Sequence, residues 1–297
     1  NYGVNFDDIE STRPQVKGFI VRELCKTPSN WRSIESLNEY LIRNNIIGIE
    51  GIDTRALTRI LRDKGTMKGI ITTDNKFSFD KKIDKIKAYE IKNPVQCVTT
   101  DKVLHYPGEG LKVALIDLGI KQNIQRSLTK RGCDVFVFPA SASAEEILSV
   151  NPDGIMLSNG PGDPKDCVDT INTIKTLIGK KPIFGICLGH QLTALASGAD
   201  TERLKYGHRG CNHPVKDLEK DMTYITSQNH GYTIVEESLD KDRMEVSHRN
   251  MNDGTIEGIR YKDVPVFTVQ FHPEASPGPT DTAYLFDEFI ELMRRNK

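Results

Sequence analysis

The stretch Pro182-Ile-Phe-Gly-Ile-Cys187-Leu-Gly-His-Gln191 decides the fold of the larger part of the chain. Its first half is a short apolar run typical of a buried strand, and helix-forming residues follow at once. Cys187 therefore stands at a strand-to-helix turn between Gly185 and Gly189, which is the pattern of a nucleophile elbow. Glycine removes the Cβ atoms that would collide in so sharp a turn. A buried structural cysteine is the alternative, which the pattern alone leaves open.

Apolar strands and amphipathic helices alternate on both sides of this stretch. We predict strands over 112–117, 134–138, 154–158, 182–186, 223–226 and 264–270, and helices near 123–131, 144–150, 167–178 and 282–295. Such alternation is typical of a parallel sheet covered by helices. We therefore predict an α/β fold with a mostly parallel open sheet.

The first third of the chain has a different character. Its clearest element is a packed helix over Asp53–Gly65, with the aspartate and the glycine as its two caps. Residues 99–110 are predicted to be a linker. A chain of 297 residues exceeds the length typical of one domain. We therefore predict a smaller, mixed α/β domain over residues 1–108 and the larger domain over residues 111–297.

The composition excludes several classes of function. The 40 Lys and Arg residues against 41 Asp and Glu residues leave a formal net charge of -1, which provides no attraction to nucleic acid. No apolar run is long enough to span a bilayer. The 6 cysteines are scattered without a CxxC pair, which is typical of a reducing compartment. We therefore expect a cytoplasmic protein that binds neither nucleic acid nor membrane.

A second stretch supplies a base for the thiol. The strand predicted over 264–270 ends at Phe271-His272-Pro273-Glu274, at the sheet edge where catalytic groups of such folds gather. Histidine has a pKa suited to taking a proton from the thiol and returning it to a leaving amine. An isolated His-Pro-Glu would be read as a surface turn, but beside an elbow we interpret Cys187, His272 and Glu274 as a catalytic triad.

A third stretch, Leu157-Ser-Asn-Gly160-Pro-Gly162-Asp-Pro164, follows another apolar strand. It would place a stiff glycine loop at the same sheet edge, although a simple turn is the alternative. The backbone N–H groups of Gly160 and of Leu188, the residue after the nucleophile, are candidate donors to an oxyanion.

Signals for metals and nucleotides are weak. His208, Cys211 and His213 suggest a metal, but this set lacks a fourth ligand and matches no zinc template. Gly179-Lys180-Lys181 runs into Pro182 instead of forming a phosphate-binding loop. We therefore predict no metal and no cofactor in this chain.

Together, the three stretches resemble those of class I, or triad, glutamine amidotransferases, over about residues 111–297. Four others are similar to the small subunit of glutamine-hydrolysing carbamoyl-phosphate synthetase: Gly51-Ile-Asp-Thr-Arg-Ala-Leu-Thr58, Asn212-His-Pro-Val215, Gln228-Asn-His-Gly231 and Pro273-Glu-Ala-Ser-Pro-Gly-Pro279. This second resemblance spans nearly the whole chain.

The resemblance implies that ammonia is released from L-glutamine through a glutamyl thioester and passes through a tunnel to a large subunit. ATP, magnesium and bicarbonate are then expected on that large subunit, and the carbamoyl phosphate would serve pyrimidine or arginine synthesis. Motif by motif, it implies glutamine contacts for Gly160, Gly162, Leu188, Gln191, Asn229, Gly231 and Tyr232. The family often has phenylalanine at the last of these, so the extra hydroxyl requires a partner or solvent.

The resemblance also implies an N-terminal domain that is incomplete at its start. Small subunits of the family begin before the equivalent of Asn1, and the upstream part contains a serine that helps to hold glutamine. Three other functions stay open: the glutaminase of another synthetase, such as anthranilate synthase or GMP synthetase, a catalytically silent regulatory subunit, and a cysteine peptidase. The Gly51–Thr58 stretch argues against the first, and the intact triad argues against the second.

Overall fold

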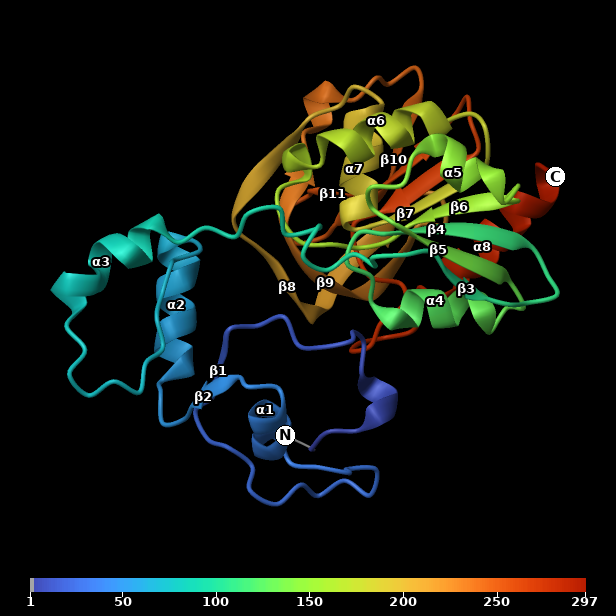
Figure 1. Cartoon of the computed structure of the whole chain (residues 1–297). Helices are drawn as coiled ribbons and strands as arrows, with labels where there is room; N and C mark the ends of the chain where they lie inside the picture. Colours follow the sequence, from blue (N-terminus) through green and yellow to red (C-terminus); the bar gives the residue numbers. More distant parts are fainter. Residues whose placement is uncertain (1–2) are drawn as a thin grey trace. The chain divides into compact units, whose positions relative to one another are not determined.

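The computed structural model describes residues 3–297, so Asn1 and the residue after it, where the predicted small domain begins, lie outside the described residues. The chain divides into two compact units, with the boundary between Lys92 and Asn93. Figure 1 shows the larger unit, in green to red, as strands flanked by helices. Within the described residues, no helix has the length and apolar character needed to cross a membrane.

The larger unit is built on a 10-stranded sheet. Its order is β3 (Leu104–Tyr106), β5 (Asp134–Pro139), β4 (Lys112–Asp117), β6 (Gly154–Leu157), β7 (Ile183–Ile186), β12 (Val266–Val269), β11 (Ile256–Tyr261), β10 (Met244–Asn250), β8 (Thr201–Asp217) and β9 (Met222–Ile234). The strands from β5 to β12 in this order are parallel. Antiparallel strands extend the sheet on both sides.

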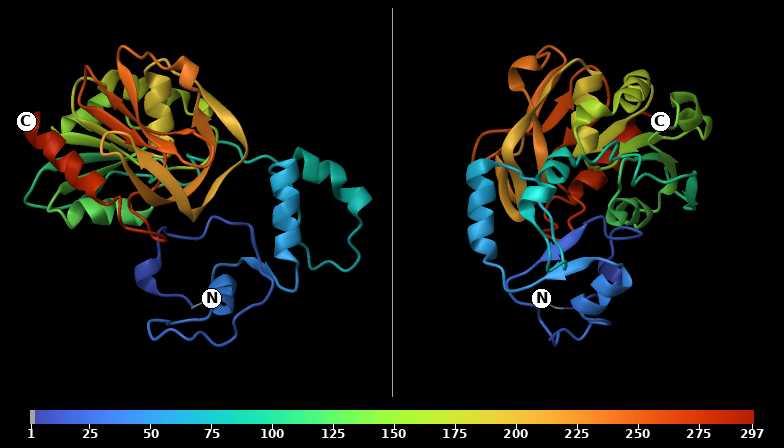
Figure 2. Two further views of the ribbon diagram at one scale, coloured as in Figure 1. Left: turned by 180° about the vertical axis from the view of Figure 1, so that it is seen from behind. Right: turned by 60° about the vertical axis from the view of Figure 1, so that its left-hand side comes forward.

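Helices cover both faces of the parallel part, as the views in Figure 2 show. They are α4 (Gln122–Thr129), α5 (Ala144–Ser149), α6 (Val168–Leu177), α7 (Leu188–Ala196) and α8 (Tyr284–Arg295), with short 3₁₀ turns at Pro164–Asp166 and Glu236–Ser238. Successive side chains of a strand point to opposite faces. In β4, Ile116 therefore joins the apolar core under α5, α6 and α7, whereas Leu115 joins the core under α4 and α8.

The predicted α/β fold is confirmed, but of the antiparallel extension the sequence predicted only residues 223–226, which lie in β9. β8 contains Gly207, Gly210 and Pro214, which are residues typical of turns. Its pairing with β9 has register shifts between Arg203 and His208 and again after Gly210. The residues predicted as a linker include β3, which pairs with β5 at the edge of the sheet.

The smaller unit is mixed α/β, as expected. It contains a 3₁₀ turn (Phe6–Asp8), β1 (Gly18–Ile20), α1 (Leu37–Arg43), β2 (Ile47–Ile49), α2 (Thr54–Lys64) and α3 (Phe79–Ala88). β1 and β2 form a parallel pair.

The helix predicted over Asp53–Gly65 is α2. The Asp53 side chain accepts a hydrogen bond from the Ala56 N–H at 3.0 Å, which satisfies one free donor of the first turn. Gly65 ends the helix with φ 83, a conformation that favours glycine. The expectation that this helix is packed in a core is wrong, because no residue of α2 is buried.

Candidate active site

Cys187 stands at the elbow that the sequence predicts, between the end of β7 and the start of α7. Its φ of 53 and ψ of -101 place it in a region that residues with a Cβ atom rarely adopt. The Cys187 N–H donates to the carbonyl of Val269 at 2.8 Å, which ties the elbow to β12. The side chain is buried, so the surrounding structure holds the strained turn in place.

The two glycines of the elbow have the mechanical role predicted for them. A Cβ atom at Gly185 would lie 2.9 Å from the backbone of Gly189. A Cβ atom at Gly189 would lie 2.6 Å from the carbonyl oxygen of Leu157 on the neighbouring strand β6. Strand and helix could not approach so closely with side chains at these positions.

His272 and Glu274 follow β12 and lie beside Cys187. The Nδ1 atom of His272 is 2.6 Å from Oε1 of Glu274. The same imidazole forms a hydrogen bond with the side chain of Cys187. Because Nδ1 faces the carboxylate, the other ring nitrogen is left for the thiol. The three side chains that the sequence grouped as a triad are thus in contact.

Charge outweighs burial at His272. Burial lowers the pKa of the imidazole, but the negative charge of Glu274 and hydrogen bonds to Cys187 and Glu274 raise it to about 10. Burial raises the pKa of Glu274, yet the positive charges of His272 and Lys121 bring it below its ordinary value. His272 is therefore a strong acceptor for the thiol proton of Cys187, and the proton that it takes up can be delivered to a leaving amine.

Lys121 is a residue of this site that the sequence analysis missed. It is the residue before α4, and its Nζ lies 3.1 Å from Oε1 of Glu274. Lys121 also donates to the carbonyl of Ala275, and the side-chain amide of Asn123 donates to the carbonyl of Glu274. The signal was available, because the segment after β4 ends at the same sheet edge as the elbow.

The glycine loop after β6 lies against the elbow. A Cβ atom at Gly160 would lie 2.2 Å from the carbonyl oxygen of Leu118 and 2.7 Å from Cδ2 of Leu188. Gly162 has φ 101, and a Cβ atom there would lie 2.4 Å from Cγ of Pro94. The structure therefore brings together Gly160 and Leu188, the two predicted oxyanion donors, while their role stays a prediction.

The remaining residues implied for glutamine come from α7 and β9. Gln191 donates its side-chain amide to the carbonyl of Tyr232 at 3.0 Å and to Oε1 of Gln270 at 2.8 Å. Asn229 has an exposed side chain and lies opposite Arg209 of β8. Gly231 separates the strand positions of Asn229 and Tyr232.

The Tyr232 hydroxyl has found a partner. Burial and a hydrogen bond with the carboxylate of Asp163 both raise the pKa of the tyrosine. Asp163 directly follows Gly162, so this bond joins β9 to the glycine loop. The requirement for a partner, which follows from tyrosine at this position, is met within the chain.

Comparisons with known proteins agree with this geometry. Residues 114–292 match the family model of class-I glutamine amidotransferases, and residues 1–71 match that of the carbamoyl-phosphate synthase small chain, CPSase domain. A structure from Thermoplasma acidophilum, provisionally described as that of a GMP synthase subunit, has a TM-score of 0.56 at 24% identity. It covers 64% of this chain and 96% of its own length and shows the fold. The larger unit is thus a class I glutamine amidotransferase domain.

Curated relatives cover both units. The carbamoyl phosphate synthase small chain of Clostridium perfringens is 56% identical over 98% of this chain and 82% of its own length. That of Bacillus caldolyticus is 55% identical over 99% and 81%. A pyrimidine-specific small chain from Bacillus subtilis is 52% identical over 99% and 80%. The chain belongs to the family of carbamoyl phosphate synthase small chains.

Proposed function

We propose that this chain hydrolyses L-glutamine as the small chain of carbamoyl phosphate synthase and passes the ammonia to a large, ATP-dependent chain. The contact between Cys187, His272 and Glu274 at the ends of β7 and β12 carries the proposal. Family membership and the matching N-terminal region support this synthase over others that use the same chemistry.

The reaction begins at the elbow. His272 takes the thiol proton of Cys187, and the sulfur attacks the side-chain carboxamide carbon of glutamine, so that a C–S bond forms while the carbonyl oxygen takes the negative charge. The backbone N–H groups of Gly160 and Leu188 receive this oxyanion, and each such donor contributes about 3 kcal/mol in the transition state.

His272 manages the protons of both halves of the reaction. Its imidazolium gives a proton to the nitrogen, the C–N bond breaks, and ammonia leaves behind a glutamyl thioester. The neutral imidazole then takes a proton from water, whose oxygen attacks the thioester carbon. The C–S bond breaks, His272 returns the proton to the sulfur, and glutamate and the free thiol result. Glu274 keeps the ring in orientation throughout.

The glycine loop, α7 and β9 would bind glutamine around the triad. We assign contacts to Gly160, Gly162, Leu188, Gln191, Asn229, Gly231 and Tyr232. Hydrolysis in this scheme needs no cofactor on this chain, and ATP, magnesium and bicarbonate belong to the large chain.

The cellular setting is part of the proposal. Six free cysteines support a reducing, cytoplasmic compartment. The product would serve pyrimidine or arginine synthesis, and one relative carries the description pyrimidine-specific.

Glutamate release from glutamine tests the proposal. We expect slow release by the chain alone, faster release with the large chain and ATP, and none from Cys187→Ser. If the large chain does not change the rate of glutamate release, the glutaminase activity stands and the proposed partner is wrong. Absence of release from the assembled complex would favour a silent regulatory role.

A further inference from the structure

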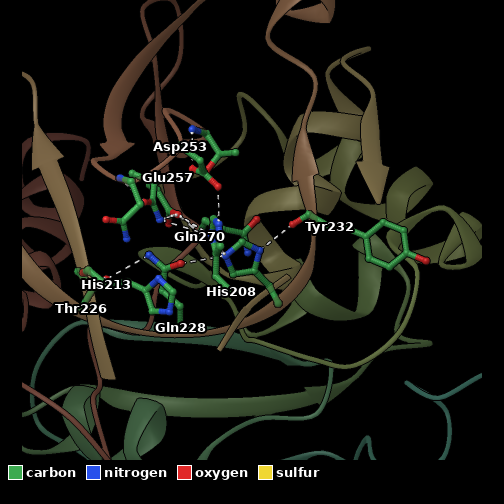
Figure 3. Close-up of polar contacts among 12 residues, drawn as sticks. His208, His213, Thr226, Gln228, Tyr232, Asp253, Glu257 and Gln270 are labelled. Atoms are coloured by element: carbon green, nitrogen blue, oxygen red, sulfur yellow. Dashed lines mark hydrogen bonds and ion pairs between the residues drawn. The ribbon is translucent and has the colours of Figure 1, made fainter. Parts of the chain in front are cut away.

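Three ionisable side chains meet in the antiparallel part of the sheet, outside the triad. His208 on β8 lies directly opposite His230 on β9. Glu257, labelled with His208 in Figure 3, comes from β11. The three side chains are 8%, 2% and 0% exposed. We call them the His208–His230–Glu257 cluster. Among the described residues it is the group whose donor atoms lie close enough to share one metal ion.

The inner atoms of the cluster converge. Nδ1 of His208 lies 3.2 Å from Nε2 of His230 and 3.4 Å from Oε1 of Glu257. Nε2 of His230 is 4.0 Å from the same carboxylate oxygen. Tetrahedral zinc with bonds of about 2.1 Å separates its ligand atoms by about 3.4 Å. The two distances from Nδ1 of His208 match such a site, whereas the 4.0 Å between His230 and Glu257 is about 0.6 Å longer.

The outer ring nitrogens already have acceptors. Nε2 of His208 is 2.7 Å from a carboxylate oxygen of Asp253, and Nδ1 of His230 is 2.8 Å from the carbonyl of Tyr232. Since these partners only accept, the outer nitrogens carry protons, and a ring that is neutral directs its lone pair inward. Carboxylate or carbonyl support of the outer nitrogen is the usual arrangement around a metal-bound histidine.

Acceptors outnumber donors around the cluster, although the side-chain amide of Asn250 donates to Oε1 of Glu257 at 3.0 Å and lies 3.5 Å from Nδ1 of His208. His230 is the clearest case, because Oε1 of Gln228 lies 3.1 Å from its inner nitrogen while a carbonyl faces its outer one. A neutral imidazole has one N–H and can satisfy only one of them. A cation at the centre would satisfy these lone pairs together.

Two features complete a coordination shell. Within residues 3–297, Oε2 of Glu257 is buried and has no hydrogen-bond partner. This oxygen or Oε1 of Gln228 is placed to act as the fourth ligand. The charges also balance, since the carboxylates of Glu257 and Asp253 together offset a divalent ion.

We propose that the His208–His230–Glu257 cluster binds a divalent transition-metal ion, for which Zn²⁺ is the best fit. Imidazole and carboxylate donors suit zinc, and a closed, buried shell is typical of a structural site. Two histidines and one carboxylate also bind iron(II), but such sites keep open positions for substrate. The side chain of Asp253, 42% exposed, marks the side from which an ion enters.

The ion would hold the glutamine-binding strand in place. The Tyr232 carbonyl accepts from His230 at 2.8 Å and from Gln191 at 3.0 Å. The cluster is therefore one hydrogen bond away from Tyr232 and two away from Gln191, which are both proposed glutamine contacts. This link rests on the proposed function, whereas metal binding does not. The ion touches no reacting atom and has a positioning role.

His208 was considered in the sequence analysis only with Cys211 and His213, a set that was rejected as a metal site. Cys211 is exposed, with its sulfur 3.7 Å from the carbonyl of Pro277. His213 stacks near His208, with ring centroids 5.3 Å apart, but is absent from the cluster. The ligands proposed here come from three strands, so no short spacing in the sequence could show them.

Metal analysis of the full chain, together with titration of the chelator-treated protein by Co²⁺, tests the proposal. We expect about one zinc per chain and the visible absorption of four-coordinate cobalt. His230→Gln and Glu257→Gln should abolish both signals. Asp253→Asn, which removes only the support of His208, should weaken metal binding by about 10- to 100-fold.

Cys211→Ser and His213→Gln are the matched controls and should bind metal as the unchanged chain does. Loss of metal from either control, or sulfur among the ligands in X-ray absorption, would overturn the assignment. If the unchanged chain takes up neither zinc nor cobalt, the cluster holds a proton on His208 instead and the proposal fails. Metal uptake by the unchanged chain is measured without glutamine and without any variant, so this result is independent of the glutaminase activity.

Discussion

His272 of the triad and His230 of the His208–His230–Glu257 cluster are both buried, yet their pKa values are shifted in opposite directions. At His272 a carboxylate lies 2.6 Å from the ring, and the pKa is raised to about 10. At His230 the carboxylate is 4.0 Å away and a neutral carbonyl takes the outer nitrogen, so desolvation dominates and the pKa falls to about 3.

The difference assigns the two histidines to different chemistry. A buried histidine that holds its proton is suited to protonating a leaving group, whereas one that stays neutral is suited to binding a cation. The contact with a charged partner, rather than the depth of burial, decides between the two roles. Substitution of these partners should therefore change the protonation of each histidine and, with it, its function.

Removal of the nucleophile should have the largest effect. Cys187→Ala should abolish glutamine-dependent carbamoyl phosphate synthesis by the complex but leave synthesis from added ammonia, because the large chain keeps its own chemistry. Both rates are measured on one preparation. Cys167→Ser, at a thiol whose pKa burial raises to about 11, is the matched control. Loss of the ammonia-dependent rate in Cys187→Ala would contradict the division of labour.

Removal of the proton carrier should be nearly as severe. His272→Ala should lower kcat for glutamine hydrolysis by about 10²–10⁴-fold, the usual contribution of a positioned acid or base. His105→Ala, at a 46% exposed histidine that pairs with Asp134 on the edge strands, should hydrolyse glutamine at the unchanged rate. Equal losses in both variants would point to general destabilisation instead.

Removal of the charge that raises the pKa of His272 should change how the stability of the fold depends on pH. The folded pKa of about 10 exceeds the ordinary 6.5, so this group stabilises the fold fully below about pH 6.5 and loses that contribution as pH rises to about 10. Glu274→Gln should flatten this decline and reduce activity less than His272→Ala. Urea unfolding at a series of pH values measures it. An unchanged pH profile would show that Glu274 does not set the charge of His272.

Removal of the Tyr232 hydroxyl should have the smallest effect. Tyr232→Phe deletes the hydrogen bond to Asp163 and should raise KM for glutamine by about 2- to 10-fold with kcat unchanged, the range expected for one hydrogen bond. Tyr224→Phe, on the same strand, serves as the control. A change in kcat alone would mean that the bond acts on the chemistry and not on the binding of glutamine.

The sequence was most informative where local rules are strict. The elbow needs glycine at two positions around Cys187, and the parallel strands alternate with helices, so both could be predicted. Of the antiparallel strands, only part of β9 was predicted, and its partner β8 was missed because β8 carries turn-type residues and is held by pairing across register shifts. Lys121 and the His208–His230–Glu257 cluster were missed for a related reason. Their partners are distant in the chain and meet only through the order of strands.

The most direct test of the central claim is to look for the glutamyl thioester itself. The complex would be mixed with isotopically labelled glutamine, quenched in acid, digested and analysed by mass spectrometry. We predict a glutamyl adduct on the peptide that contains Cys187, which disappears in Cys187→Ser. Label on another cysteine, or none during steady glutamate release, would contradict attack by Cys187.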